Sequence, residues 1–288
     1  MHPYPFSYHR ATSVEDALTV LAEHEDDGKI LAGGQSLLPV MKLRLASPGT
    51  IIDITGLSEL RGVSLVGEAV EIGALTTHHD IETDPTLAAQ VPLLPAIAHV
   101  VGDQQVRHRG TFGGTLAHAD AAGDYPAGVL ALGAEVVIQG PDGERVVPIH
   151  EFFLGFLTTA LAPNELITRV RIPVPPAGTG WSYQKLANPA SGYAIVGVAV
   201  ILTTGDGGTI ETLRIGITGA SDIAYRPTAT EAALAGATPD GESIKAAAAL
   251  ATDGVDILGD QHAPEDYRAR VTQNLVRRAI EDALSKAG

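Results

Sequence analysis

In the N-terminal part of the chain, apolar residues recur first with helical spacing and then in short continuous runs. Residues 13–22 begin with a serine and carry their apolar side chains on one helical face, so they predict a capped helix. The runs at 29–32 and 50–54 predict buried strands, and residues 36–43 between them predict a helical turn capped by Ser36. This order of helix, strand, helix and strand indicates a small α/β unit.

The middle of the chain is patterned as short strands and turns. A Pro-Asp-Gly turn at 141–143 joins two apolar runs into a predicted hairpin. The predicted strands are 63–65, 69–72, 73–77, 134–138, 144–148 and 165–172. Helical patterns begin near Asp80 and cover 92–101 and 126–132. The glycine pair at 113–114 is interpreted as part of a turn.

A proline-rich segment, 173–176, is the one credible linker, and it separates two differently patterned halves. Three strands at 180–187, 193–204 and 209–219 are predicted after it. Helices at 228–235, 242–251 and 265–287 close the chain. The last helix carries an apolar stripe that is interpreted as core: Tyr267, Val271, Leu275, Val276, Ile280 and Leu284.

Two glycine pairs of similar form are the strongest candidate binding features. The first segment is Ala32-Gly33-Gly34-Gln35-Ser36, which follows a strand, and the second is Thr111-Phe112-Gly113-Gly114-Thr115. Glycine tolerates positive φ and lets peptide N–H groups face an anion with no Cβ in the way. Because both pairs end in a hydroxyl residue, they predict two backbone surfaces that approach one ligand, of which a diphosphate is the most common.

Composition narrows the classes of function. The chain has 288 residues, a formal net charge of −15 and no cysteine. The acidic balance argues against wrapping nucleic acid or binding an anionic membrane, so backbone N–H groups are expected to hold any phosphate. Without cysteine, the chain offers no disulfide, no thiol nucleophile and no cysteine-ligated iron–sulfur cluster. No apolar run approaches 18 residues, which favours a cytoplasmic location.

Three other chemistries fit the sequence less well. Asp53 ends a strand about 20 residues after the first pair, as a ribose-binding acid would, but the GxGxxG pattern is absent and Asp53 is interpreted as a turn residue. The ten histidines, including the adjacent His78 and His79, lack metal-ligand spacing, so no metal site is predicted. Ser36, Thr111 and Thr115 do not sit in a nucleophile motif and are interpreted as phosphate contacts or caps.

Three further residues each allow a functional and a purely structural interpretation. Asp124 precedes a predicted helix, so it is either a helix cap or a carboxylate that accepts hydrogen bonds from a cofactor. Lys185 lies in a strand, where it is either a solvated charge or a ligand contact. Tyr193 begins the most apolar strand and is either core or a platform on which a ring stacks.

Taken together, Ala32 to Pro39 and Gln105 to His118 resemble the corresponding segments of the FAD-binding subunits of molybdenum hydroxylases, with the medium subunits of aerobic carbon monoxide dehydrogenases most similar. The likeness extends over essentially the whole chain. It implies an α+β fold in which a two-subdomain FAD-binding α/β domain of the PCMH type precedes a small C-terminal domain with a three-stranded antiparallel sheet and helices. The implied boundaries are 1–175 (subdomains about 1–55 and 56–175) and 176–288.

The resemblance also implies roles for individual residues. Ala32 to Ser36, with Leu37, and Thr111 to Thr115 match the cradle for the diphosphate and ribityl chain of FAD. Asp124 and Lys185 match contacts on the flavin side, and Tyr193 matches an aromatic residue beside the isoalloxazine. Val101 and Ile167 match apolar contacts. Relatives often have histidine at the position of Gln35, and in more distant flavin oxidases of this fold a histidine can hold FAD covalently. Glutamine cannot form such a bond, so the resemblance implies noncovalent FAD in this chain. No catalytic residue is assigned in this chain.

The family further implies partners. The resemblance implies that a molybdopterin-containing large subunit oxidises the substrate and that a small subunit with 2Fe–2S clusters passes electrons to FAD, which hands them to a quinone or another acceptor. A dimer of heterotrimers is expected, either free in the cytoplasm or held at the inner face of the membrane through the complex. A complex that hydroxylates aldehydes or N-heterocycles, a stand-alone flavin reductase and a non-catalytic nucleotide-binding module remain open as alternatives.

Overall fold

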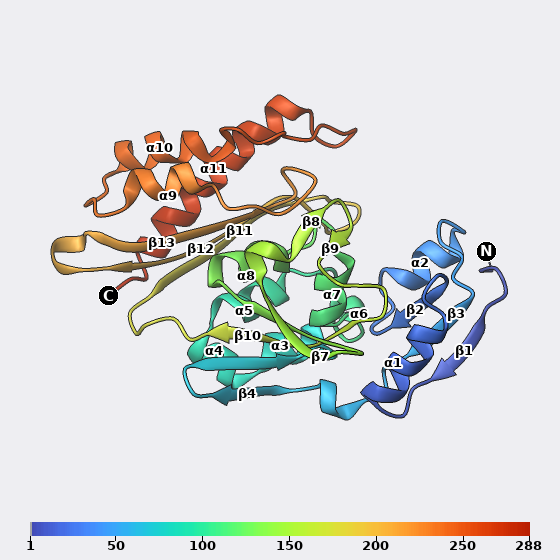
Figure 1. The fold of residues 1–288 in the computed structure, drawn as a ribbon. Coiled ribbons are helices and arrows are strands. Elements are labelled where there is room, and N and C mark those ends of the chain that lie inside the picture. The colour runs from blue at the N-terminus through green and yellow to red at the C-terminus, as the bar shows by residue number, and fades with distance from the viewer. Residues whose placement is uncertain (1) are drawn as a thin grey trace.

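The structure is a computed structural model that describes residues 2–288, and Figure 1 shows its arrangement. Three main sheets follow one another along the chain, each with its own helices, and a fourth, two-stranded sheet is a small hairpin. The N-terminal part contains β1 (Ser7–Arg10), α1 (Val14–Glu23), β2 (Gly28–Leu31), α2 (Leu37–Lys42), β3 (Thr50–Asp53) and the 3-10 turn η1 (Ser58–Leu60). The three strands pair in parallel in the order β1-β3-β2.

The second part is built on a five-stranded antiparallel sheet with the order β4-β5-β10-β6-β7. Its strands are β4 (Val63–Val66), β5 (Ala69–Gly73), β6 (Glu135–Gly140), β7 (Gly143–Pro148) and β10 (Leu166–Pro173). Its helices are α3 (His78–Thr83), α4 (Pro85–Gln90), α5 (Leu93–His99), α6 (Gln104–Arg107), α7 (Phe112–His118) and α8 (Tyr125–Leu132). The turn η2 (Ile149–Glu151) leads into a small hairpin, β8 (Phe153–Gly155) and β9 (Thr158–Thr159).

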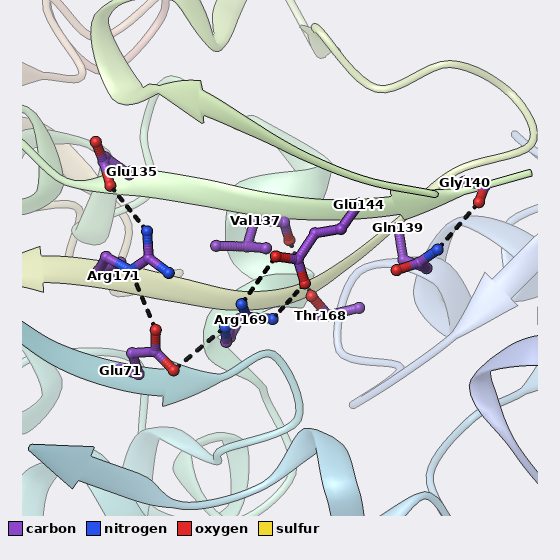
Figure 2. A network of polar contacts seen from close by, with 9 residues as sticks. All are labelled: Glu71, Glu135, Val137, Gln139, Gly140, Glu144, Thr168, Arg169 and Arg171. Carbon is purple, nitrogen blue, oxygen red and sulfur yellow. Dashed lines mark hydrogen bonds and ion pairs between the residues drawn. The ribbon is translucent and has the colours of Figure 1, made fainter. Parts of the chain in front are cut away.

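One face of the five-stranded sheet carries alternating charges across neighbouring strands. Arg169 and Arg171 of β10 lie between Glu71 of β5 on one side and Glu144 of β7 and Glu135 of β6 on the other, as Figure 2 shows. Cross-strand pairs of opposite charge favour one register over its neighbours. The opposite face bears the buried side chains that pack against α5, α7 and α8.

The C-terminal part contains β11 (Gly180–Ala187), β12 (Ala194–Thr204) and β13 (Ile210–Thr218) in one antiparallel sheet, with the turn η3 (Asp206–Gly208) between the last two. Its helices are α9 (Thr228–Leu234), α10 (Gly241–Ala249) and α11 (Glu265–Leu284), with the turn η4 (Leu250–Thr252) between α10 and α11. These helices cover one face of the sheet, and α8 of the second part packs against the sheet as well (Figure 1).

The predicted fold class is confirmed, with corrections to single elements. The run 73–77 is not a strand, because Thr76 and Thr77 leave β5 in a turn and contact residues 111–112. Strand β1 and helices α4 and α6 were not predicted. In the last helix Leu275, Val276 and Ile280 are buried as expected, whereas Tyr267 is 43% exposed and lies outside the core.

Candidate cofactor-binding site

The first glycine segment forms a tight connection between β2 and α2. Gly34 has φ of +75°, a conformation that side chains with a Cβ rarely adopt, and this residue turns the chain from the strand toward the helix. The expected Ser36 cap is wrong, because the Ser36 side chain makes no capping hydrogen bond to α2. The Ser36 hydroxyl is therefore available to other partners.

The backbone of this segment offers a row of unused donors. Among residues 2–288, no acceptor within the chain receives a hydrogen bond from the amides of residues 33–37. Helix N-termini leave such amides for capping groups, water or ligands. Five consecutive free N–H groups around a left-handed glycine are donors of the kind that bind anionic oxygens.

The second glycine segment differs from its expected form. Thr111 is the N-cap of helix α7, and both glycines lie in the first helical turn instead of in a turn between strands. The amides of Phe112 and Gly113 donate to the carbonyls of Thr76 and Ala74, both at 2.9 Å. The amide of Gly114 donates to the Thr111 hydroxyl at 3.3 Å, so the backbone N–H groups expected to face an anion are already satisfied here.

The two glycine segments nevertheless lie against each other, although they are far apart in sequence. A Cβ added to Gly33 would stand 2.8 Å from Gly110 Cα and closer still to the Arg109 carbonyl oxygen. A Cβ on Gly114 would stand 3.7 Å from the Ala32 Cβ. The structure therefore brings the two segments into direct contact, the first with its free amides and the second with the hydroxyls of Thr111 and Thr115.

A buried charged cluster lies at the start of α8. Lys185 Nζ is 2.8 Å from Asp124 Oδ1, and the two side chains are only 7% and 6% exposed. Tyr183 donates a 2.6 Å hydrogen bond to the same carboxylate, and Lys185 also donates to the Val100 carbonyl at 3.0 Å. Burial raises the pKa of Asp124, and the Lys185 charge opposes that shift. Asp124 is thus no helix cap, and Lys185 is no solvated charge.

The loop before α8 is fastened to the C-terminal sheet. The Thr218 hydroxyl donates to the carbonyls of Ala121 and Gly123, and the Ala194 amide donates to the Ala122 carbonyl at 3.1 Å. Next to these hydrogen bonds the Tyr193 side chain, 42% exposed, reaches toward Ser36 of the first glycine segment. Partial burial and the nearby charge of Asp120 raise the pKa of the Tyr193 hydroxyl. The C-terminal sheet is therefore connected to the loop before α8 by hydrogen bonds and to the first glycine segment through Tyr193.

The remaining predicted site residues, Phe112, Ile167 and Val101, are buried or partly buried in the hydrophobic core. Phe112 is fully buried and packs edge-on against Tyr125, with ring centroids 5.0 Å apart. Ile167 is 5% exposed in the same core, and Val101 packs against that core. For Phe112 and Ile167 the structure shows a packing role, and their part in cofactor binding stays a prediction.

Three polar residues of the site were not anticipated in these roles. Tyr183 joins the Asp124 cluster, and Arg107 of α6 pairs with Glu82 of α3 at 2.8 Å. His78 is 4% exposed, and burial, with the Arg107 charge nearby, lowers its pKa to about 4. No local motif marks these residues, because their partners lie on other elements.

The chemical groups of these residues fit those of FAD. FAD carries a diphosphate, ribose and ribityl hydroxyls and a flat ring. The residues offer free amides that suit the diphosphate, hydroxyls that suit the ribose and ribityl groups, and a half-exposed aromatic residue that suits the ring. Cavities of about 290 and 250 Å³ lie elsewhere, near Trp181 and near Arg61, and neither of these two is lined by a predicted site residue. Among residues 2–288 no cluster of three metal-ligating side chains occurs. No helix within the described range could span a membrane.

Comparison with known families defines the class. Residues 4–175 match the FAD binding domain in molybdopterin dehydrogenase, and residues 181–283 match the CO dehydrogenase flavoprotein C-terminal domain. The chain therefore belongs to the FAD-binding chains of the molybdopterin dehydrogenase family, a family of oxidoreductases. The predicted family and the predicted FAD cofactor are therefore confirmed.

Individual relatives cover the whole length. The carbon monoxide dehydrogenase medium chain of Hydrogenophaga pseudoflava is 38% identical over 99% of this chain and 99% of the relative. The 6-hydroxypseudooxynicotine dehydrogenase complex subunit alpha of Paenarthrobacter nicotinovorans is 37% identical over 100% of this chain and 97% of its own length. A solved carbon monoxide dehydrogenase of Hydrogenophaga pseudoflava superposes with a TM-score of 0.98 at 41% identity, covering 100% of both chains.

Proposed function

We propose that this chain is the FAD-carrying medium subunit of a molybdenum hydroxylase complex, and that it transfers electrons from a partner's iron–sulfur clusters to an external acceptor. The observation that carries the proposal is the row of five free amides, residues 33–37, held against Arg109 and Gly110. That arrangement suits the diphosphate of FAD in a chain whose net charge of −15 offers few cations for the purpose.

Each group of the site has a defined task in this proposal. The amides of 33–37 and the hydroxyls of Thr111 and Thr115 would hold the cofactor, and Tyr193 would supply an aromatic contact to its ring. The buried Lys185 and Asp124 would present a fixed pair of charges to the flavin side. When bound, FAD supplies the ability to exchange electrons singly and in pairs. The protein positions the ring, excludes water from one side and leaves another side open to an acceptor.

The absence of cysteine supports a division of labour among subunits. Iron–sulfur clusters are held by cysteine thiolates, so they require another chain. The medium-chain names of the relatives support a complex with large and small partners. A dimer of heterotrimers, a quinone acceptor and association with the inner face of the membrane through the complex remain parts of the proposal.

The first test uses the purified chain. The protein is expected to show flavin absorbance, and denaturation is expected to release FAD and leave a colourless polypeptide, because Gln35 cannot form a covalent link. Purified protein that takes up no FAD would contradict the proposal. Flavin that stays with the denatured polypeptide would contradict the noncovalent part alone.

The second test uses the native complex and separates the remaining candidates. Co-purification with a molybdenum-containing chain supports a hydroxylase subunit, whereas NADH oxidation by the isolated chain indicates a flavin reductase. For the substrate we favour carbon monoxide, which the carbon monoxide dehydrogenase that superposes with a TM-score of 0.98 supports. Nicotine-related relatives of nearly equal identity make an N-heterocycle the second candidate. Reduction of a dye by the complex under carbon monoxide, compared with nicotine and an aldehyde, distinguishes these substrates.

A further inference from the structure

His78 is a buried titratable group that no part of the proposed function uses. It is the first residue of α3, and its backbone amide donates to the Gly110 carbonyl at 3.0 Å. This bond, with the one from Phe112 to Thr76, joins the turn after β5 to the segment that leads into α7. The imidazole therefore lies directly behind the second glycine segment.

The imidazole is fitted closely into this position. A Cβ on Gly110 would stand 2.5 Å from His78 Nε2, so only glycine leaves room for the ring. The Tyr125 ring packs on it with centroids 5.2 Å apart. Nε2 faces the Thr115 hydroxyl at 3.5 Å, whereas Nδ1 has no hydrogen-bond partner among residues 2–288.

The unpaired Nδ1 determines which nitrogen carries the proton. A buried N–H without an acceptor is rarer in proteins than a buried acceptor without a donor. The tautomer protonated at Nε2 leaves only a lone pair unsatisfied at Nδ1 and directs a donor at Thr115 Oγ1. Since burial lowers the pKa of His78 to about 4, the ring stays neutral near pH 7 and keeps this tautomer.

We infer that His78 is a positioning residue that makes the Thr115 hydroxyl a donor to FAD. With its oxygen accepting from Nε2, the hydroxyl of half-buried Thr115 turns its hydrogen away from His78. The neighbouring Gly114 lies against the first glycine segment, since a Cβ added there would stand 3.7 Å from the Ala32 Cβ, so a cofactor held by that segment is within reach of the hydroxyl. This role offsets the satisfied amides of α7, which offer FAD no N–H of their own. The inference rests on the proposed function, since it requires FAD at this site.

The test compares two amides of different reach. In His78→Gln the amide nitrogen can stand at the place of Nε2, whereas in His78→Asn it reaches only the place of Nδ1. FAD affinity of the full chain, measured by flavin fluorescence titration, is expected to stay within about 3-fold of wild type for glutamine and to fall about 10-fold for asparagine. Thermal unfolding of each variant without FAD reports whether it is folded.

A double-mutant cycle identifies the partner. Thr115→Val is expected to weaken FAD binding at least as much as His78→Asn, and the double variant is expected to bind no more weakly than Thr115→Val alone. Equal affinities of the glutamine and asparagine variants would overturn the inference, and so would additive losses in the cycle. Wild-type chain that binds no FAD would contradict the proposed function itself, so the two failures are distinguishable.

Discussion

Gly33 is the position at which the close contact between the two glycine segments can be tested most directly. The φ of Gly33 lies outside the left-handed region, so alanine could adopt the same backbone conformation. The added Cβ, however, would stand 2.8 Å from Gly110 Cα, where carbon atoms in contact lie about 3.5–4.0 Å apart. The two nearest atoms, the Arg109 carbonyl oxygen and Gly110 Cα, both belong to the backbone and cannot rotate away. Gly33→Ala must therefore push the segments about 1 Å apart.

The cost of this displacement can be bounded. Overpacking of a well-packed site costs about 1–3 kcal/mol. If the free protein relaxes by separating the segments, FAD binding must restore their contact, and the Kd for FAD rises about 5- to 150-fold. If the segments stay together, the strain appears instead as a lower Tm, by about 2–4 °C for each kcal/mol. Measuring both quantities on the same preparation captures the whole cost.

Flavin fluorescence titration and thermal unfolding without FAD are the two assays. Gly241→Ala is the matched control, because a Cβ there meets nothing within 4 Å and lies on α10 of the C-terminal domain. The control is expected to retain wild-type FAD affinity and Tm. Gly33→Ala with both values unchanged would refute the contact between the segments, and with it the two-sided site.

Three further predictions concern buried charge and packing. Lys185→Met leaves the Asp124 carboxylate without its cation and is expected to lower the free energy of unfolding by about 3–5 kcal/mol. The pKa of Asp124, already raised by burial, then rises further, so protonation of the carboxylate at low pH relieves part of the loss. Urea unfolding should therefore show a smaller deficit at pH 5 than at pH 8. Equal deficits at both pH values would contradict this. Gly216→Ala would press a Cβ into the backbone of α8 and should lower the urea midpoint by an amount that corresponds to about 1–3 kcal/mol, whereas an unchanged midpoint would show that α8 can shift freely. Although partial burial opposes it, hydrogen bonds from Arg268 and two amides lower the pKa of Asp260 to about 2, so the deficit of Asp260→Asn should be full above pH 4 and disappear as the pH falls toward 2; a deficit independent of pH would refute the pairing.

The elements that were predicted correctly are those with strong local patterns. The helix beginning after Ser13 is capped as expected, with the serine accepting from Asp16 N, and β11 runs over the predicted residues 180–187. Strand β1 was missed because its residues are mostly polar and exposed, and only pairing with β3 makes them a strand. Asp124 was ambiguous because local sequence suggests a cap, whereas its partner Lys185 comes from another domain.

The two glycine pairs show most clearly where local inference ends. Both contain two glycines followed within two positions by a hydroxyl residue, Ser36 or Thr115, and both were expected to present backbone amides. In the structure the first pair keeps its amides free, whereas those of the second are taken by the carbonyls of Ala74 and Thr76, which lie in a turn well upstream. That turn was itself predicted as a strand, so the acceptors could not be foreseen. The second segment therefore has only its side-chain hydroxyls left to offer, and under the proposed role of His78 the orientation of the Thr115 hydroxyl decides whether this half of the proposed site binds FAD.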